Sequence, residues 1–126
     1  MCTLTFAWRA FADAPLVVAA NRDESLDRES EPPSVVEGDP SFLAPRDAVA
    51  GGTWIGHNES GVFAGLTNRW VRVDGGGERS RGRLVGDVLR TESAEAAREV
   101  VESAVEAAAY DGFNLIVADG DGTGRD

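Results

Sequence analysis

The side chain with the clearest chemical use is that of Cys2, the single cysteine of the chain, which directly follows Met1. Because cysteine is small, we expect Met1 to be removed, which leaves a free α-amine of pKa about 7.7 to 8.0 beside a thiol of pKa about 8.5. One residue would then hold both a nucleophile and its general base. The amine takes the thiol proton as sulfur attacks a carbonyl, and returns it to the departing nitrogen. Taken alone, a cysteine at this position is more often a buried or incidental thiol.

A charged tetrapeptide, Asn21-Arg22-Asp23-Glu24, directly follows an apolar run that predicts a buried strand. Rigid strands aim the side chains at their ends, so a charged cluster in this place is typical of a functional site. Asp23 could hold the protonated α-amine, and Arg22 could lower the pKa of the thiol. The alternative is a solvated turn with local ion pairs, and the residues alone leave both interpretations open.

The remaining candidate side chains favour structural roles. His57 is the only histidine, so the sequence predicts no metal site of ordinary spacing, and an exposed strand-end histidine is the better interpretation. Trp8, Trp54 and Trp70 are expected in the core or at the lip of a pocket. The glycine run 75–77 lacks the strand and helix context of a phosphate loop. No cofactor is therefore expected.

The charge of the chain limits its partners. The formal net charge is -10 at pH 7, from 22 acidic and 12 basic residues, and every basic residue is arginine. This balance argues against nucleic acid as a partner, because phosphate binding needs a basic surface. The one basic cluster is expected to be a solvated loop face or a docking site for a substrate anion. It consists of Arg69, Arg72, Arg79, Arg81 and Arg83.

The same composition favours a salt-rich cytoplasm, with codon bias toward arginine as the alternative. Excess carboxylates keep a surface hydrated, and molar salt screens their repulsion beyond about 3 Å. One cysteine excludes an internal disulfide. No apolar run reaches the roughly 18 residues that span a membrane, and the start of the chain lacks the pattern of a signal peptide. We therefore expect a soluble, halophilic, cytoplasmic protein that does not insert into a membrane.

The apolar pattern predicts two hairpins in the first half of a single domain of 126 residues. Their strands are expected at 2–8 and 16–20, and at 51–57 and 61–68. Residues 21–40 between the hairpins are rich in polar residues, glycine and proline. They are expected to form a long surface loop.

Two helices and a strand are expected in the second half. Ser80 can cap the first helix, whose apolar face consists of Leu84, Val85, Val88 and Leu89. Ser93 precedes the second, alanine-rich helix, whose apolar face consists of Val100, Val101, Ala104, Val105 and Ala108. Residues 113–118 predict a further strand. Antiparallel hairpins followed by helices are typical of a layered α+β architecture.

Several ordered blocks give the chain a specific resemblance to a known family. They are Cys2, the tetrapeptide 21–24, Gly51-Gly52-Thr53-Trp54-Ile55-Gly56, residues 58–68 ending in Leu66-Thr67-Asn68, Ser80-Arg81-Gly82, and residues 112–119. Together the blocks span nearly the whole chain and resemble the NRDE family, which includes the transport-and-Golgi-organisation proteins of eukaryotes. That family in turn resembles the N-terminal-nucleophile hydrolases of the penicillin V acylase and bile salt hydrolase group.

The resemblance implies a fold and a set of site residues. The fold is a four-layer αββα sandwich, expected to be incomplete at the C-terminus because the chain stops before the later strands. Carried over by motif, Cys2 is the nucleophile, Asp23 supports its amine, and Asn68 donates to the oxyanion. The residues expected to bind the substrate are Asn21, Arg22, Trp54 and Asn114.

The activity implied is that of an amidohydrolase acting on a nonpeptide carbon–nitrogen bond, with Cys2 as nucleophile after removal of Met1. The alternative is a carrier that keeps the fold without the chemistry, since eukaryotic relatives have been linked to lipid and haem handling. Haem would need an axial ligand such as His57 or Cys2.

Overall fold

Seven strands and two helices make up the part of the chain that the computed structural model describes, residues 2–69 and 79–120. The strands are β1 (Thr3–Phe11), β2 (Ala14–Asn21), β3 (Ser30–Val36), β4 (Phe42–Asp47), β5 (Ile55–Asn58), β6 (Phe63–Asn68) and β7 (Phe113–Ala118). The helices are α1 (Arg81–Val88) and α2 (Ala94–Ala107). The strand pairings among these residues are antiparallel, so the expected α+β class is confirmed.

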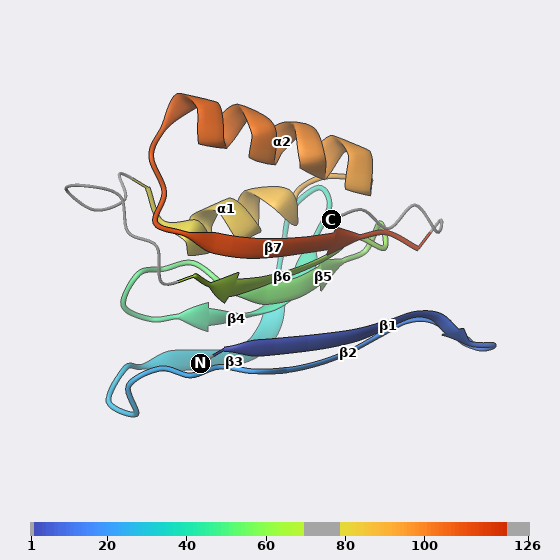
Figure 1. The fold of residues 1–126 in the computed structure, drawn as a ribbon, viewed down its shortest axis with the longest axis horizontal. Coiled ribbons are helices and arrows are strands. Elements are labelled where there is room, and N and C mark those ends of the chain that lie inside the picture. Colours follow the sequence, from blue (N-terminus) through green and yellow to red (C-terminus); the bar gives the residue numbers. More distant parts are fainter. Residues whose placement is uncertain (1, 70–78, 121–126) are drawn as a thin grey trace.

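The elements are arranged in layers (Figure 1). A five-stranded sheet of order β3-β4-β5-β6-β7 has α1 and α2 on one face and the two-stranded β1-β2 sheet on the other. The two sheets approach closely, because a Cβ built on Gly65 of β6 would lie 2.5 Å from Leu4 Cδ1 of β1. The described residues therefore give the order helices, sheet, sheet. The second helical layer that the resemblance implies stays a prediction.

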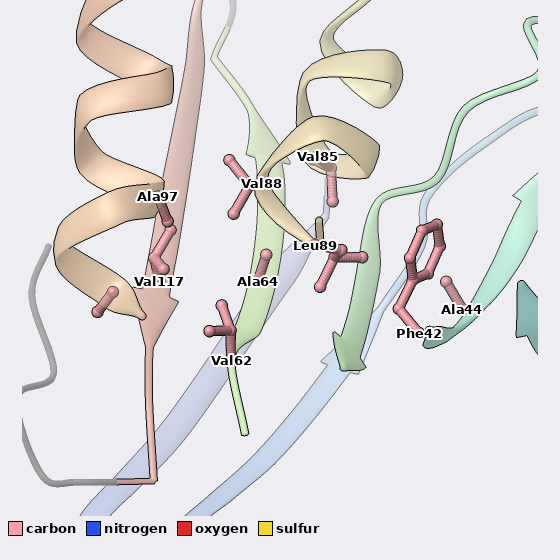
Figure 2. Close-up of a cluster of buried hydrophobic side chains, with 10 residues drawn as sticks. Phe42, Ala44, Val62, Ala64, Val85, Val88, Leu89, Ala97 and Val117 are labelled. Carbon is pink, nitrogen blue, oxygen red and sulfur yellow. The ribbon is translucent and has the colours of Figure 1, made fainter. Parts of the chain in front are cut away.

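The buried core lies between the helices and the five-stranded sheet. Figure 2 shows Val85 and Val88 of α1, and Leu89 directly after it, on the side of α1 that faces Ala64 of β6, with Ala97 of α2 beside Val117 of β7. The predicted apolar face of the first helix is confirmed, because its four residues are each at most 1% exposed. Burying one such side chain stabilises the fold by about 1.5–3 kcal/mol.

Both predicted helix starts are confirmed. Ser80 Oγ accepts a hydrogen bond from Arg83 N at 3.3 Å, and Ser93 Oγ accepts one from Ala96 N at 3.1 Å. Each serine thereby satisfies an N–H of the first turn that has no partner within the helix. The two caps fix where the chain turns into α1 and α2.

The predicted hairpins and the final strand also form. Phe6 pairs with Val18 across β1 and β2, Gly56 pairs with Ala64 across β5 and β6, and β7 pairs with β6. The strand predicted at 51–57 begins only at Ile55. The predicted apolar face of α2 is too long, because Val105 is 46% exposed while the buried residues of α2 lie in its first turns.

The loop predicted over residues 21–40 is wrong in part, because it contains β3. Pro32 and Pro33 have no backbone N–H and would therefore disfavour a strand inside a sheet. β3 is an edge strand, where one side has no neighbouring strand that needs the missing N–H. Its pairing register with β4 shifts between Glu31 and Ser34, around the two prolines. The short strand β4 is not predicted by the apolar pattern at all.

Some predicted features lie outside the described residues, namely Met1, Trp70, Arg72 and the glycine run 75–77. Within the described part, neither helix has the length and apolar character needed to cross a membrane.

Candidate functional site

A cavity of about 330 Å³ lies where the two sheets meet the start of α1. This volume is at the lower end of the range for small-molecule pockets, about 300–1,000 Å³. The wall combines the start of β1, the end of β2 with the residues after it, Asp47, residues between β4 and β5, the end of β6, and residues 79–82. Segments far apart in the sequence thus form one surface.

Cys2 is fixed at this wall by its neighbours across the β1-β2 pairing. Asp23 N donates a hydrogen bond to Cys2 Sγ at 3.3 Å, and the thiol lies 3.9 Å from the carbonyl oxygen of Asp23. One residue further on, Thr3 N donates to Asn21 Oδ1 at 3.0 Å. Cys2 is partly exposed, so its sulfur is held in one place beside the cavity without being sealed in the core.

Six of the seven predicted site residues line the cavity. They are Cys2, Asn21, Arg22, Asp23, Trp54 and Asn68. Asn68 is the last residue of β6 and pairs with Phe113 of β7. The five-stranded sheet therefore supplies the amide side chain of Asn68, and the residue directly before β1 supplies the thiol.

The seventh predicted residue, Asn114, is not among the lining residues. It lies on β7 opposite Thr67, and its Nδ2 donates a hydrogen bond to Thr67 Oγ1 at 3.2 Å. Thr67 itself lines the cavity. Asn114 is thus connected to the wall through a neighbouring side chain.

Arg22 is held by two partners on the five-stranded sheet side. Its guanidinium carbon lies 3.9 Å from the centre of the Trp54 ring, and its Nη2 donates to Asp47 Oδ2 at 2.8 Å. A guanidinium over an indole face is attracted by the ring's quadrupole as well as by dispersion. The side chain is only 21% exposed, so Arg22 is part of the wall.

Asp47 is the functional candidate that the sequence does not reveal. Besides Arg22, Arg28 Nε donates to Oδ2 at 2.8 Å, while Val49 N and Ala50 N donate to Oδ1 at 2.9 and 3.1 Å. Burial alone would raise the pKa of Asp47, but hydrogen bonds from Ala50, Arg28 and Val49 and the charge of Arg28 outweigh it and lower the pKa from 3.8 to about 2. Asp47 is therefore ionised at neutral pH. The only sequence signal is an Arg-Asp pair shortly before the Gly-Gly-Thr-Trp block.

The start of α1 reaches the cavity because two glycines meet. A Cβ on Gly52 would lie 2.4 Å from the carbonyl carbon of Gly82. At the same contact, Thr53 N donates a hydrogen bond to Gly82 O at 3.2 Å. Any side chain on Gly52 would push the helix start away, so these glycines place residues 79–82 in the wall.

The charged side chains of the wall balance in number. Four arginines face the cavity together with four carboxylates: Arg22, Arg28, Arg79 and Arg81, and Asp23, Glu24, Asp47 and Asp111. Arg81 Nη1 donates to Gly112 O at 2.9 Å, and Asp111 Oδ1 is buried without a hydrogen-bond partner among the described residues. Of the predicted basic cluster, Arg69 and Arg83 are not in the wall, and Arg72 lies outside the described residues.

A second, larger groove of about 540 Å³ lies between the β1-β2 sheet and the side of β4, β5 and β6 that faces away from the helices (Figure 1). Its lining is mainly apolar and includes Trp8, Leu16, Val18 and Phe63, with His57 at its wall. Within residues 2–69 and 79–120, no group of three or more His, Cys, Asp or Glu side chains is arranged to hold a metal ion.

Comparison with known proteins gives a consistent family assignment. A family model described as Transport and Golgi organisation 2 matches residues 1–125. The chain is 34% identical over 107 residues to the mouse (Mus musculus) Transport and Golgi organization 2 homolog and 35% identical over 107 residues to the human (Homo sapiens) protein. Each match covers 82% of this chain but only 38% of the relative. This chain is a member of the Transport and Golgi organisation 2 family.

Proposed function

We propose that this protein is an N-terminal-nucleophile amidohydrolase that cleaves a nonpeptide carbon–nitrogen bond of a small molecule in the cytoplasm. The observation that carries the proposal is the position of Cys2 Sγ, partly exposed at the cavity and 3.3 Å from Asp23 N. A nucleophile must be held in place and yet reach a ligand, and this sulfur meets both needs. The presence of Asp23 and Asn68 in the same wall supports the proposal further.

The reaction follows from the groups in the wall once Met1 is removed. The α-amine of Cys2 takes the thiol proton as Sγ bonds to the amide carbon, and Asn68 donates a hydrogen bond to the oxyanion that forms. The amine then gives the proton to the leaving nitrogen, the carbon–nitrogen bond breaks, and a thioester remains. Water attacks the thioester with the amine again as base, which releases the acid and restores the thiol.

The test is hydrolysis of a panel of small N-acyl amides by the purified protein, by Cys2→Ala and by Asn68→Ala. Loss of Cys2 removes the nucleophile and should abolish turnover. Loss of one oxyanion donor should lower kcat by about 10²- to 10³-fold with a smaller change in KM. Asn114→Ala is the matched control, an amide near the site but not in the cavity wall, and should keep most of the activity. Equal turnover by Cys2→Ala and the wild type would rule out the proposed nucleophile.

A non-catalytic lipid or haem carrier is the second candidate, favoured by the apolar groove of about 540 Å³ with His57 at its wall. An apolar groove suits the chain of a lipid or the flat ring of haem, and an imidazole can bind the haem iron. Titration with haem should then give a Soret shift that His57→Ala removes. An identical spectrum for wild type and variant would exclude haem binding through this histidine.

A further inference from the structure

Asp47 joins three segments that surround the cavity. One carboxylate oxygen accepts hydrogen bonds from Arg22, directly after β2, and from Arg28 in the following loop, each at 2.8 Å. The other oxygen accepts from Val49 N and Ala50 N in the turn after β4. Because β4 belongs to the five-stranded sheet and Arg22 follows the two-stranded sheet, this carboxylate links the two sheets at the site.

Only one peptide group separates Arg22, the partner of Asp47, from the sulfur of Cys2. The N–H that donates to Cys2 Sγ at 3.3 Å belongs to the peptide between Arg22 and Asp23. The side chain of Arg22 is fixed on both sides, by Asp47 and by the ring of Trp54. An anchored side chain restricts the backbone that carries it, and Arg22 is directly bonded to the peptide that carries this N–H.

Asp47 also pairs with both arginines that follow β2. An arginine beside a cysteine lowers the thiol pKa by stabilising the thiolate. Here Arg22 is paired with Asp47, and Arg28 is paired with Asp47 and lies 4.0 Å from Glu24 Oε2. The two positive charges after β2 are therefore paired with the carboxylates of Asp47 and Glu24.

We propose that Asp47 is a positioning residue of the Cys2 site, which aims the Asp23 N–H at the sulfur through Arg22 and withholds the charge of Arg22 from the thiol. The inference rests on the proposed function for the use of the thiol, but the reactivity of the thiol can be measured without a substrate.

The experiment measures the rate of Cys2 alkylation by iodoacetamide against pH in the wild type, Asp47→Asn, Arg22→Gln and the double variant. Asparagine keeps an oxygen for the arginines but removes the negative charge. The apparent thiol pKa should then fall, and alkylation at neutral pH should rise about three- to tenfold. In the Arg22→Gln background the same change should have a smaller effect, because only the charge of Arg28 then remains to be exposed.

The control is Val62→Ala, which removes methyl groups from a fully buried core side chain that is not in the cavity wall. It should lower the melting temperature without moving the alkylation profile. If Asp47→Asn behaves like this control, or acts equally with and without Arg22, the role of Asp47 is merely structural and the inference is overturned.

Arg22→Gln alone keeps the inference testable if Asp47→Asn does not fold. The Asp23 amide hydrogen should exchange with solvent faster in Arg22→Gln than in the wild type, because the side chain that aims this N–H is gone, whereas unchanged exchange would overturn the inference. Amide hydrolysis is assayed separately. If alkylation changes as expected but no amide is hydrolysed, the proposed function is wrong and the role of Asp47 stands. If amides are hydrolysed but alkylation does not change as expected, the proposed function stands and the role of Asp47 is overturned.

Discussion

Gly52 and Gly82 meet backbone to backbone at the rim of the cavity, where a Cβ on Gly52 would lie 2.4 Å from the carbonyl carbon of Gly82. Backbone atoms cannot move aside as the end of a side chain can. This contact therefore fixes the distance between the segment before β5 and the start of α1, and with it one side of the candidate site.

Gly52→Ala should destabilise the protein by about 1–3 kcal/mol, the usual cost of overpacking, and should separate residues 79–82 from the cavity. The matched control is Gly86→Ala, because a Cβ at Gly86 within α1 meets nothing within 4 Å. Alanine favours a helix over glycine by about 0.5–1 kcal/mol, so this control should stabilise. Chemical denaturation measures both changes, and a destabilising Gly86→Ala or a neutral Gly52→Ala would contradict the packing described.

The buried side chain of Asn58 should matter for stability more than its small size suggests. Its Nδ2 donates to Leu89 O at 3.0 Å and Thr91 O at 2.7 Å, and its Oδ1 accepts from Ser60 N and Val62 N. Asn58→Ala leaves several of these buried groups without partners, at a cost of about 1–3 kcal/mol for each group that stays dry. Urea unfolding of Asn58→Ala should thus show a large loss, while the exposed Asn114→Ala should change the free energy of unfolding by about 0.5 kcal/mol or less.

Asp47 should stabilise the fold in a defined pH range. Its pKa is lowered to about 2 in the folded protein, against about 3.9 in an unfolded chain. A lowered pKa means that the stabilisation is complete above about pH 4 and is lost as the pH falls through about 2. Between about pH 5 and 7 Asp47 is ionised in both the folded and the unfolded protein, so the difference in free energy of unfolding between wild type and Asp47→Asn should be constant there. Below about pH 4 the difference should shrink. A difference that does not change with pH would show that the carboxylate charge is not what stabilises.

The acidic surface should make stability depend on salt. The formal net charge is -10, so the excess carboxylates repel one another in dilute buffer, and salt screens that repulsion. The melting temperature should rise between about 0.1 and 2 M sodium chloride as the screening length falls from about 10 Å to a few Å. Equal melting temperatures at both concentrations would argue against adaptation to a salt-rich cytoplasm.

The periodic elements could be predicted from sequence because their signals are local. Ser80 and Ser93 mark helix starts, and the alternation in β1 and β6 marks strands. The strand β3 was hidden by Pro32 and Pro33, because whether a strand lies at an edge is a property of the whole sheet.

The candidate site could be predicted only as far as motifs mark it. Cys2 and the tetrapeptide after β2 stand out by position and charge. Asp47 does not stand out, because its partner Arg22 is 25 residues away in sequence. The sequence alone does not indicate that the end of β4 lies close to the end of β2. Asn114 shows the opposite limit, since a motif residue can lie beside a cavity wall without entering it.

The central claim is that the sulfur of Cys2 and an unblocked α-amine act together. Its most direct test is intact-protein mass spectrometry of the purified wild type before and after a brief incubation with a small N-acyl amide that the protein hydrolyses. We predict a mass lower by one methionine, and then an acyl adduct that maps to Cys2 and that hydroxylamine removes. A chain that retains Met1, or an adduct found on any other residue, would contradict the account.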